Sequence, residues 1–307
     1  VRSNSGSSGS GSSGGGGTSG GSSVTVPVSG DQNTIHVSVS VSGSTATVSR
    51  IDTAQINNVI GDSVKTGMVE IDFTGLGKTI DTVKLPAAPI GEIAAAAQSP
   101  ANDVTGLTIK LTTGEIAFDG KALAALYARA SSQITLTVTP ARTADLNNWQ
   151  REAVGNSPVF DLTLRSSSGA ITDFRGGYAT VSLPYTLTAG QNPSGVVVYY
   201  LDSTGNITPC ATMYDVRSKA AIFTTGHLSL YFVGYDPAAV WVSPFSDVSE
   251  GAWYYDAVRY ASENGLMGGY GNGLFGPNDN LSRAQFAQIL FNREGRPVVN
   301  YLLQYGD

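Results

Sequence analysis

The sequence predicts an α+β protein in which a mixed α/β region and a β-sandwich-like region precede a small all-α module. Three observations favour this class. Apolar and polar residues alternate over residues 35–42, as in a half-buried strand. Short strand patterns with turn residues between them recur from 156 to 235, which is typical of a sandwich. Two helical patterns then follow between 252 and 295, the second opened by an N-cap signature.

The composition sets limits on partners and chemistry. A chain of 307 residues has room for two or three domains, and its 41% apolar residues are enough for real cores. The net charge of −6 argues against a nucleic-acid partner, which requires a basic face. No stretch is long and apolar enough for membrane insertion. The single cysteine, Cys210, excludes a disulfide framework within the chain and reads as a small strand residue.

The first part of the chain divides into a Gly/Ser linker and an α+β surface region. Residues 1–23 are almost wholly Gly and Ser, which predicts a flexible linker. Because no Met opens the chain, we expect a fragment with a domain upstream. Residues 24–155 form the α+β region, with a short helix expected at 52–60 and further helices at 90–98, after Asp119 and at 143–153. Its strand–turn–strand–helix order occurs twice, at 68–98 and 107–130, which leaves an internal duplication open.

Residues 156–235 form the β-sandwich-like region. Strands are expected at 159–164, 179–185, 195–201, 207–211, 220–224 and 228–233. Turn signals such as Ser168-Gly169 and Asn192-Pro193 separate them. Residues 236–239 read as a hinge into the final module.

Catalytic and metal constellations are hard to build from this sequence. A Ser/His/Asp triad would need one of the two histidines, His36 or His227, and neither has the expected surroundings. None of the carboxylates considered for a glycosidase pair has flanking aromatic residues enough to suggest a sugar cleft, and we read all four as solvated acids: Glu115, Asp119, Asp161 and Asp173. The segment Asn278-Asp279-Asn280 reads as a turn, since it lacks the later Glu of an EF-hand. We therefore expect no catalytic residues, no metal and no cofactor.

The final module, residues 241–296, has the most structured local pattern. A first helix is expected from about Ala252 to Glu263, a Gly-rich turn follows, and Ser282 with Gln285 forms a capping box for a second helix. Packing explains most of the module, including a buried stripe on the second helix formed by Phe286, Ala287, Ile289 and Leu290.

Three residues of this module are not needed for packing: Asp247, Trp253 and Arg283. Arg283 begins the second helix, where the helix dipole disfavours a cation. An acid, an indole and a guanidinium together suit an acidic saccharide, because Arg pairs with its carboxylate, Asp accepts hydroxyl hydrogen bonds and Trp stacks on the ring.

The same residues carry a family resemblance. Phe245-Ser246-Asp247-Val248, Trp253-Tyr254 and Leu281-Ser282-Arg283-Ala284-Gln285 together resemble a surface-layer homology (SLH) module. Ser replaces the usual Thr and Gln the usual Glu of the last motif, so capping is kept but a charge is lost. The resemblance implies binding of secondary cell-wall polysaccharide, often pyruvylated, by Asp247, Trp253 and Arg283. Such modules usually occur in threes, with sugar sites between them. Further SLH modules of the same parent chain are therefore the expected partners. Residues 297–307 are expected to be the start of a truncated second module.

A looser resemblance concerns the β-sandwich-like region. Residues 177–185 and 223–231 resemble a β-domain often placed before SLH modules in Gram-positive surface proteins, which implies a spacer without an active site. The whole then reads as a non-enzymatic, extracellular protein of the cell wall or S-layer, anchored non-covalently through its C-terminal module. The alternatives are a wall-anchored carbohydrate-active hydrolase or an adhesin, whose working part is 24–235 or lies upstream.

Overall fold

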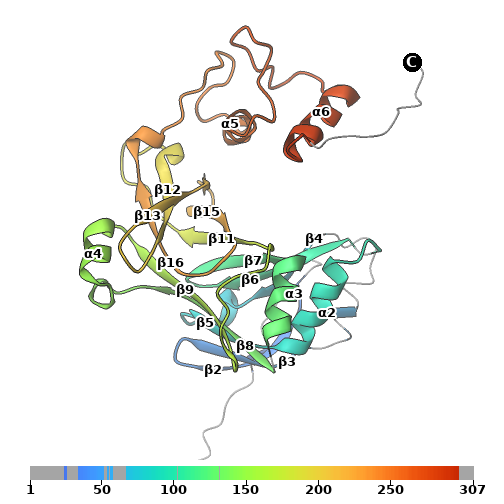
Figure 1. Cartoon of the computed structure of the whole chain (residues 1–307), viewed down its shortest axis with the longest axis vertical. Helices are drawn as coiled ribbons and strands as arrows, with labels where there is room; N and C mark the ends of the chain where they lie inside the picture. Colours follow the sequence, from blue (N-terminus) through green and yellow to red (C-terminus); the bar gives the residue numbers. More distant parts are fainter. Residues whose placement is uncertain are drawn as a thin grey trace, which may run out of the picture.

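The computed structural model describes residues 24–25, 34–51, 54, 56–57, 67–101, 103–130 and 132–296. The predicted linker at 1–23, most of the short helix predicted at 52–60, and the predicted start of a second module at 297–307 lie outside the described residues. Two mixed sheets with helices form the larger part of the molecule, which is the predicted α+β class. Helices α5 and α6 lie at the end of the molecule opposite β2 and β3 (Figure 1).

The described residues contain a larger sheet of ten strands. In spatial order these are β1 (Val24–Thr25), β2 (Val37–Ser42), β3 (Thr45–Ile51), β5 (Thr82–Pro86), β8 (Gln133–Pro140), β9 (Val159–Ser166), β16 (Leu230–Tyr235), β12 (Val196–Leu201) and β13 (Ile207–Cys210), with β10 (Gly169–Ala170) paired to β9. All neighbours pair antiparallel except β3 and β5, which are parallel. The alternation predicted for residues 35–42 is confirmed in β2, since Val37 and Val39 are buried and Ser38 and Ser40 are exposed.

A smaller sheet of six strands lies within the same described part of the chain. Its order is β14 (Thr212–Asp215), β15 (Ala220–Thr225), β11 (Ala179–Pro184), β7 (Gly114–Asp119), β6 (Val104–Leu111) and β4 (Gly67–Asp72). The hairpin of β6 and β7 is the predicted one, whereas β14 was not predicted. Only Ala211 separates β13 from β14, so the chain passes there from the larger sheet to the smaller.

Capping residues in the sequence account for where some of the helices begin. The helices named among the described residues are α2 (Ala87–Ala97), α3 (Gly120–Arg129), α4 (Asn148–Val154), α5 (Tyr255–Glu263) and α6 (Arg283–Arg293), with 3₁₀ turns η1 (Thr74–Leu76), η2 (Thr143–Asp145), η3 (Pro193–Gly195) and η4 (Pro237–Ala239). The Asp119 carboxylate caps α3 by accepting from the Ala122 N–H at 2.7 Å. Asn147 caps α4, so the helix predicted from 143 begins only after a separate 3₁₀ turn.

The two stretches of similar pattern differ in topology. In 107–130 the strands β6 and β7 form one hairpin before α3. In 68–98 the strands β4 and β5 belong to different sheets. α2 and α3 nevertheless lie side by side against β6 and β7 (Figure 1). The repeated order of elements is therefore not a repeated fold.

One hydrophobic core joins both sheets. It contains buried residues of the larger sheet, such as Leu136 and Leu162, and of the smaller sheet, such as Ile116 and Val181. Strands predicted to belong to 24–155 pair with strands of 156–235 in both sheets, through β8 with β9 and β7 with β11. On the outer face of the larger sheet, Phe232 packs in a second cluster with α4. The C-terminal module lies next to these shared sheets.

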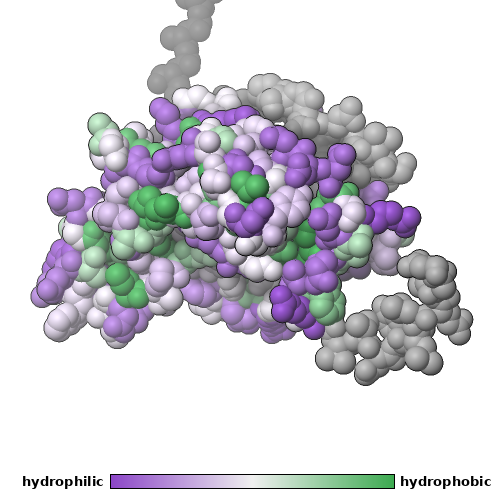
Figure 2. Space-filling model, turned by 90° about the horizontal axis from the view of Figure 1, so that it is seen from above, coloured by the Kyte–Doolittle hydropathy of each residue, from purple (hydrophilic) through white to green (hydrophobic). Residues whose placement is uncertain are grey.

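The view from the module end shows a mixed surface. Green apolar areas on that face are small and are separated by purple polar areas and by white areas of intermediate hydropathy (Figure 2). No helix among the described residues has the length and hydropathy to span a membrane.

Candidate functional site

The C-terminal module has a small core of its own. Phe245, Val248, Tyr255 and Val258 are buried together, and Phe275 from the later loop packs on Phe245 with ring centroids 5.1 Å apart. The Tyr255 hydroxyl donates to the Trp241 carbonyl oxygen at 2.9 Å. This core fixes α5 against the opening segment of the module.

Asp247 ties the opening segment to the Gly-rich loop. Its two carboxylate oxygens accept hydrogen bonds from the backbone N–H groups of Phe275 and Gly276, each at 2.8 Å. The Phe275 N–H chiefly, together with the Gly276 N–H, holds the pKa of Asp247 below its ordinary value. The contacts of the Asp247 carboxylate are therefore structural, because they position the Gly-rich loop.

The loop between the two helices depends on glycine backbone freedom. Gly269, Gly271 and Gly273 have φ angles of 67°, 77° and 81°, in the region that side chains disfavour. The Tyr270 N–H donates to the Leu274 carbonyl at 2.9 Å, and the Tyr270 hydroxyl donates to Asp279 at 2.8 Å. The loop is thus folded back on itself by internal hydrogen bonds.

Trp253 lies before α5 and not within it. Turn hydrogen bonds from Ala252 N–H to Ser249 and from Tyr255 N–H to Ala252 come first, and the helix starts at Tyr255, three residues later than predicted. The Trp253 side chain is 87% exposed. An indole this exposed makes little contribution to packing, which agrees with the prediction that it is not a packing residue.

Arg283 is the first residue of α6, as predicted. Ser282 is the N-cap, and its side chain and that of Gln285 form the predicted capping box. The Arg283 side chain is exposed and forms no ion pair with any part of the chain that the structure describes. The guanidinium is therefore available to an anionic ligand.

The predicted buried stripe on the second helix is wrong for this chain. Phe286 is 54% exposed and Leu290 is 40% exposed, and none of the residues of α6 is buried. The Asn292 side chain donates to the Leu266 carbonyl at 3.1 Å and connects α6 to the loop. Helical spacing identified the apolar face correctly, but within the described residues this face is only partly covered, with Ile289 half-buried beside the Gly-rich loop.

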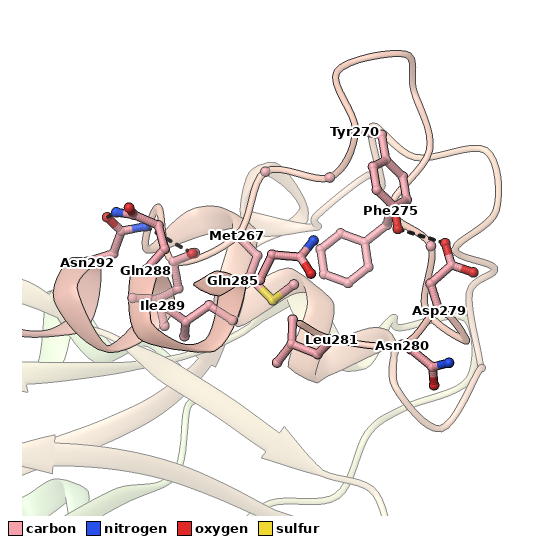
Figure 3. A pocket seen from close by; sticks show the side chains of 14 residues that line it. Met267, Tyr270, Phe275, Asp279, Asn280, Leu281, Gln285, Gln288, Ile289 and Asn292 are labelled. Atoms are coloured by element: carbon pink, nitrogen blue, oxygen red, sulfur yellow. Dashed lines mark hydrogen bonds between the residues drawn. The ribbon is translucent and has the colours of Figure 1, made fainter. Parts of the chain in front are cut away.

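A groove of about 300 Å³ lies between α6 and the Gly-rich loop. Met267, Phe275 and Leu281 point into it, together with the amide of Gln285 (Figure 3). Gln285, Gln288 and Asn292 also line it at helical spacing, so an apolar floor is bordered by amide donors and acceptors. Sequence reasoning missed Gln288 and Asn292, although their three- and seven-residue spacing from Gln285 marks one helix face.

The structure does not gather the three predicted site residues into one hollow. Asp247 lines a small hollow with Tyr270 and Asp279, next to the groove. Trp253 lines a separate cleft on the side of the module that faces the sheets. Arg283 lies on the helix surface and lines none of these hollows.

The residues weighed for catalysis have structural contacts. The Nδ1 atom of His227 lies 3.3 Å from the Tyr231 hydroxyl, and burial lowers the pKa of this histidine. Asp173 forms an ion pair with Arg129 at 2.8 Å. Burial raises the pKa of the Cys210 thiol, which makes it less nucleophilic. Within the part of the chain that the structure describes, no group of three or more His, Cys, Asp or Glu residues could hold a metal ion.

Comparisons with known proteins find similarity to bacterial cell-surface proteins. The chain is 33% identical to the surface-layer 125 kDa protein of Lysinibacillus sphaericus over 135 residues, 42% of this chain and 10% of that one. It is 38% identical over 50 residues to cell surface glycoprotein 1 of Acetivibrio thermocellus, covering 16% of this chain and 2% of that protein. It is 36% identical over 47 residues to the cellulosome-anchoring protein of the same organism, covering 15% and 10%. The chain thus spans a tenth or less of the length of these curated relatives.

No solved structure matches the chain. The family model of the S-layer homology domain matches residues 244–287, which hold the Asp247 tie, α5, the Gly-rich loop and the start of α6. This chain therefore contains an S-layer homology domain.

Proposed function

We propose that this chain belongs to a non-enzymatic, extracellular protein that is held non-covalently on cell-wall polysaccharide through its S-layer homology domain. The single observation that carries this proposal is the exposed Arg283 guanidinium at the start of α6, without an acidic partner among the described residues. A charge-assisted bond from Arg to a carboxylate, such as that of a pyruvylated sugar, fits this position. The names of the surface-layer and cellulosome-anchoring relatives support the same location.

The other predicted site residues have different roles in this proposal. Asp247 holds the Gly-rich loop through Phe275 and Gly276, so it positions the groove wall beside α6. Trp253 provides a stacking surface on the other side of the module. The amides of Gln285 and Gln288 in the groove can hydrogen-bond sugar hydroxyls.

Further S-layer homology modules of the same protein are the proposed partners of α6. The exposed Phe286 and Leu290 side chains form an apolar face on that helix. A second module packed there would bury this face and extend the groove into a longer saccharide site.

Co-sedimentation with purified wall sacculi tests the proposal. The natural protein should sediment with intact sacculi and stay in the supernatant when the attached polysaccharide has been stripped. Arg283→Ala should weaken binding by about ten- to a hundredfold, because a hydrogen bond to a charged group contributes about 1.5–3 kcal/mol. Arg293→Ala is the matched control, since it removes an exposed cation from the other end of α6. Equal losses in both variants, or equal binding to stripped sacculi, would contradict the proposal.

A further inference from the structure

A second concave site lies outside the groove of the module, between the module and the smaller sheet. This cleft has a volume of about 750 Å³, within the range of ligand-binding sites. Met213 of β14 and the following Val216 and Arg217 line one wall. Trp253 and Asp256 line the other wall, from the turn before α5 and from the helix itself.

Specific hydrogen bonds hold the two walls together. Ser194 of η3 is almost fully buried at 2% exposure. Its carbonyl oxygen accepts from the Arg259 guanidinium of α5 at 3.2 Å, and its hydroxyl oxygen accepts from the Trp241 N–H at 3.1 Å. The Asn192 side-chain amide donates to Glu250 across the same junction. The cleft is therefore preformed, and a ligand would not have to order it on binding.

The side chains of the cleft indicate the chemistry of an occupant. The exposed face of Trp253 is a flat apolar surface of the kind that stacks on a sugar ring. Among the described residues, the Asp256 carboxylate accepts no hydrogen bond, so its oxygens are open to a donor. Three carboxylates line the cleft, and Arg217 is the one cation among its lining residues: Asp215, Glu250 and Asp256 against that guanidinium.

This charge balance distinguishes the cleft from the Arg283 surface. An excess of carboxylates disfavours the acidic sugar units proposed for Arg283 and attracts a unit that carries a protonated amine. The Asp256 carboxylate can also accept a hydrogen bond from a sugar hydroxyl, whereas Asp215 and Glu250 already accept from Ser218 and Asn192. A saccharide with free amino groups can stack a ring on Trp253, donate hydrogen bonds to the carboxylates and complement their negative charge. A basic peptide can complement the charge but has no sugar ring to stack.

We propose that the cleft between β14 and the turn before α5 binds a saccharide carrying free amino groups, with Trp253 stacking on a ring and Asp256 accepting from the ammonium group. The choice of a saccharide rests on the proposed function, which places the module on wall polysaccharide. In this proposal the smaller sheet forms one wall of the sugar site, so it is more than a spacer.

Calorimetric titration of the full chain with defined tetramers tests this inference. A tetramer of glucosamine should bind, and the fully N-acetylated tetramer should bind at least about tenfold more weakly, because acetylation removes the charge. Trp253→Ala and Asp256→Asn should each weaken binding of the glucosamine tetramer about tenfold. Arg217→Gln should strengthen it, because it removes a like charge from the cleft.

Two further titrations distinguish a saccharide site from a cleft that attracts any cation. A tetralysine peptide that binds as tightly as the glucosamine tetramer would overturn the proposal, since charge alone would then account for binding. Unchanged binding in Trp253→Ala would overturn it as well, and far-UV circular dichroism verifies that this exposed substitution leaves the fold intact. Arg283→Ala should reduce sedimentation with sacculi but not tetramer binding, so failure of the wall-anchoring proposal can be told apart from failure of this one.

Discussion

Some residues of the module use their polar groups in hydrogen bonds within the chain, and others have exposed side chains that a ligand could contact. Asp247 accepts two backbone hydrogen bonds and is engaged in holding the Gly-rich loop. Arg283 and Trp253 have exposed side chains that the packing of the module does not use. The three residues share a sequence signature, but the contacts they make within the chain separate structural support from ligand binding.

The pKa of Asp247 gives a prediction at this scale. Because its folded-state pKa is lowered from the ordinary 3.8, Asp247 stabilises the module above about pH 3.8 and loses that contribution as the pH falls through the lower folded value. The protection factors of the Phe275 and Gly276 amides, which correct for the pH dependence of intrinsic exchange, should therefore fall at acidic pH. Asp247→Asn should lower these protection factors already at neutral pH, because one carbonyl oxygen replaces two acceptors.

A titration of the side-chain carboxyls tests the pKa of Asp247 directly, with Asp256 as the internal reference. Burial raises the pKa of Asp256, with Arg259 acting in the opposite direction. In one carbon-detected titration of the side-chain carboxyls, Asp247 should titrate below and Asp256 above the ordinary value of 3.8. A titration of Asp247 at or above 3.8 would show that the loop hydrogen bonds do not persist in solution.

At the scale of elements, α6 differs from α5 in what covers it. α5 buries Tyr255 and Val258 in the module core, whereas no residue of α6 is buried. Helix α6 is thus held by its capping box, by contacts such as that of Asn292 with Leu266, and by the half-buried Ile289, without a fully buried apolar side chain.

This difference predicts opposite costs of substitution in the two helices. Phe286→Ser should lower the free energy of unfolding by less than about 0.5 kcal/mol, as at other surface positions. Val258→Ala should lower it by about 2 kcal/mol, because it leaves a cavity in the core. Urea denaturation of the two variants measures both values. A cost for Phe286→Ser as large as that for Val258→Ala would mean that α6 is covered in this chain.

Elements with local causes could be predicted from the sequence. The alternation of β2 and the caps Asp119 and Ser282 depend on neighbours in the chain, and the structure confirms them. β14 was missed because it begins two residues after β13 ends and is defined by pairing with β15 in the other sheet. The stripe of α6 was mistaken because periodicity identifies an apolar face without saying what packs on it.

The candidate site could be predicted in part for the same reason. The position of Arg283 at the start of α6 follows from its N-cap neighbour. The cleft beside Trp253 could not be predicted, because one wall comes from β14 and the other from the turn before α5. Their meeting depends on the buried Ser194, which no local pattern connects with Arg259.

At the scale of the whole molecule, the stretches 24–155 and 156–235 share two sheets and one core. A contact between them is centred on the N-terminus of α3. Asp119 accepts from the Tyr178 N–H at 3.2 Å as well as from Ala122, and the Asp119 N–H donates to the Tyr178 carbonyl at 3.1 Å. We therefore expect residues 24–235 to unfold in one cooperative transition.

Gly177 tests this expectation, because it brings the segment before β11 against the first turn of α3. A Cβ atom at this position would lie 2.2 Å from the Ala122 backbone nitrogen, so the helix or the strand would have to move. Gly177→Ala should therefore lower the free energy of unfolding by about 3 kcal/mol, the upper range for an overpacked core. Scanning calorimetry should show one transition for both stretches, shifted down by roughly 2–4 °C per kcal/mol. Gly75→Ala is the matched control, since no atom lies within 4 Å of a Cβ there, and it should leave the transition unchanged. If Gly177→Ala split the transition in two, with strands of 24–155 melting apart from those of 156–235, the stretches would be separate domains and the shared sheets would not act as one unit.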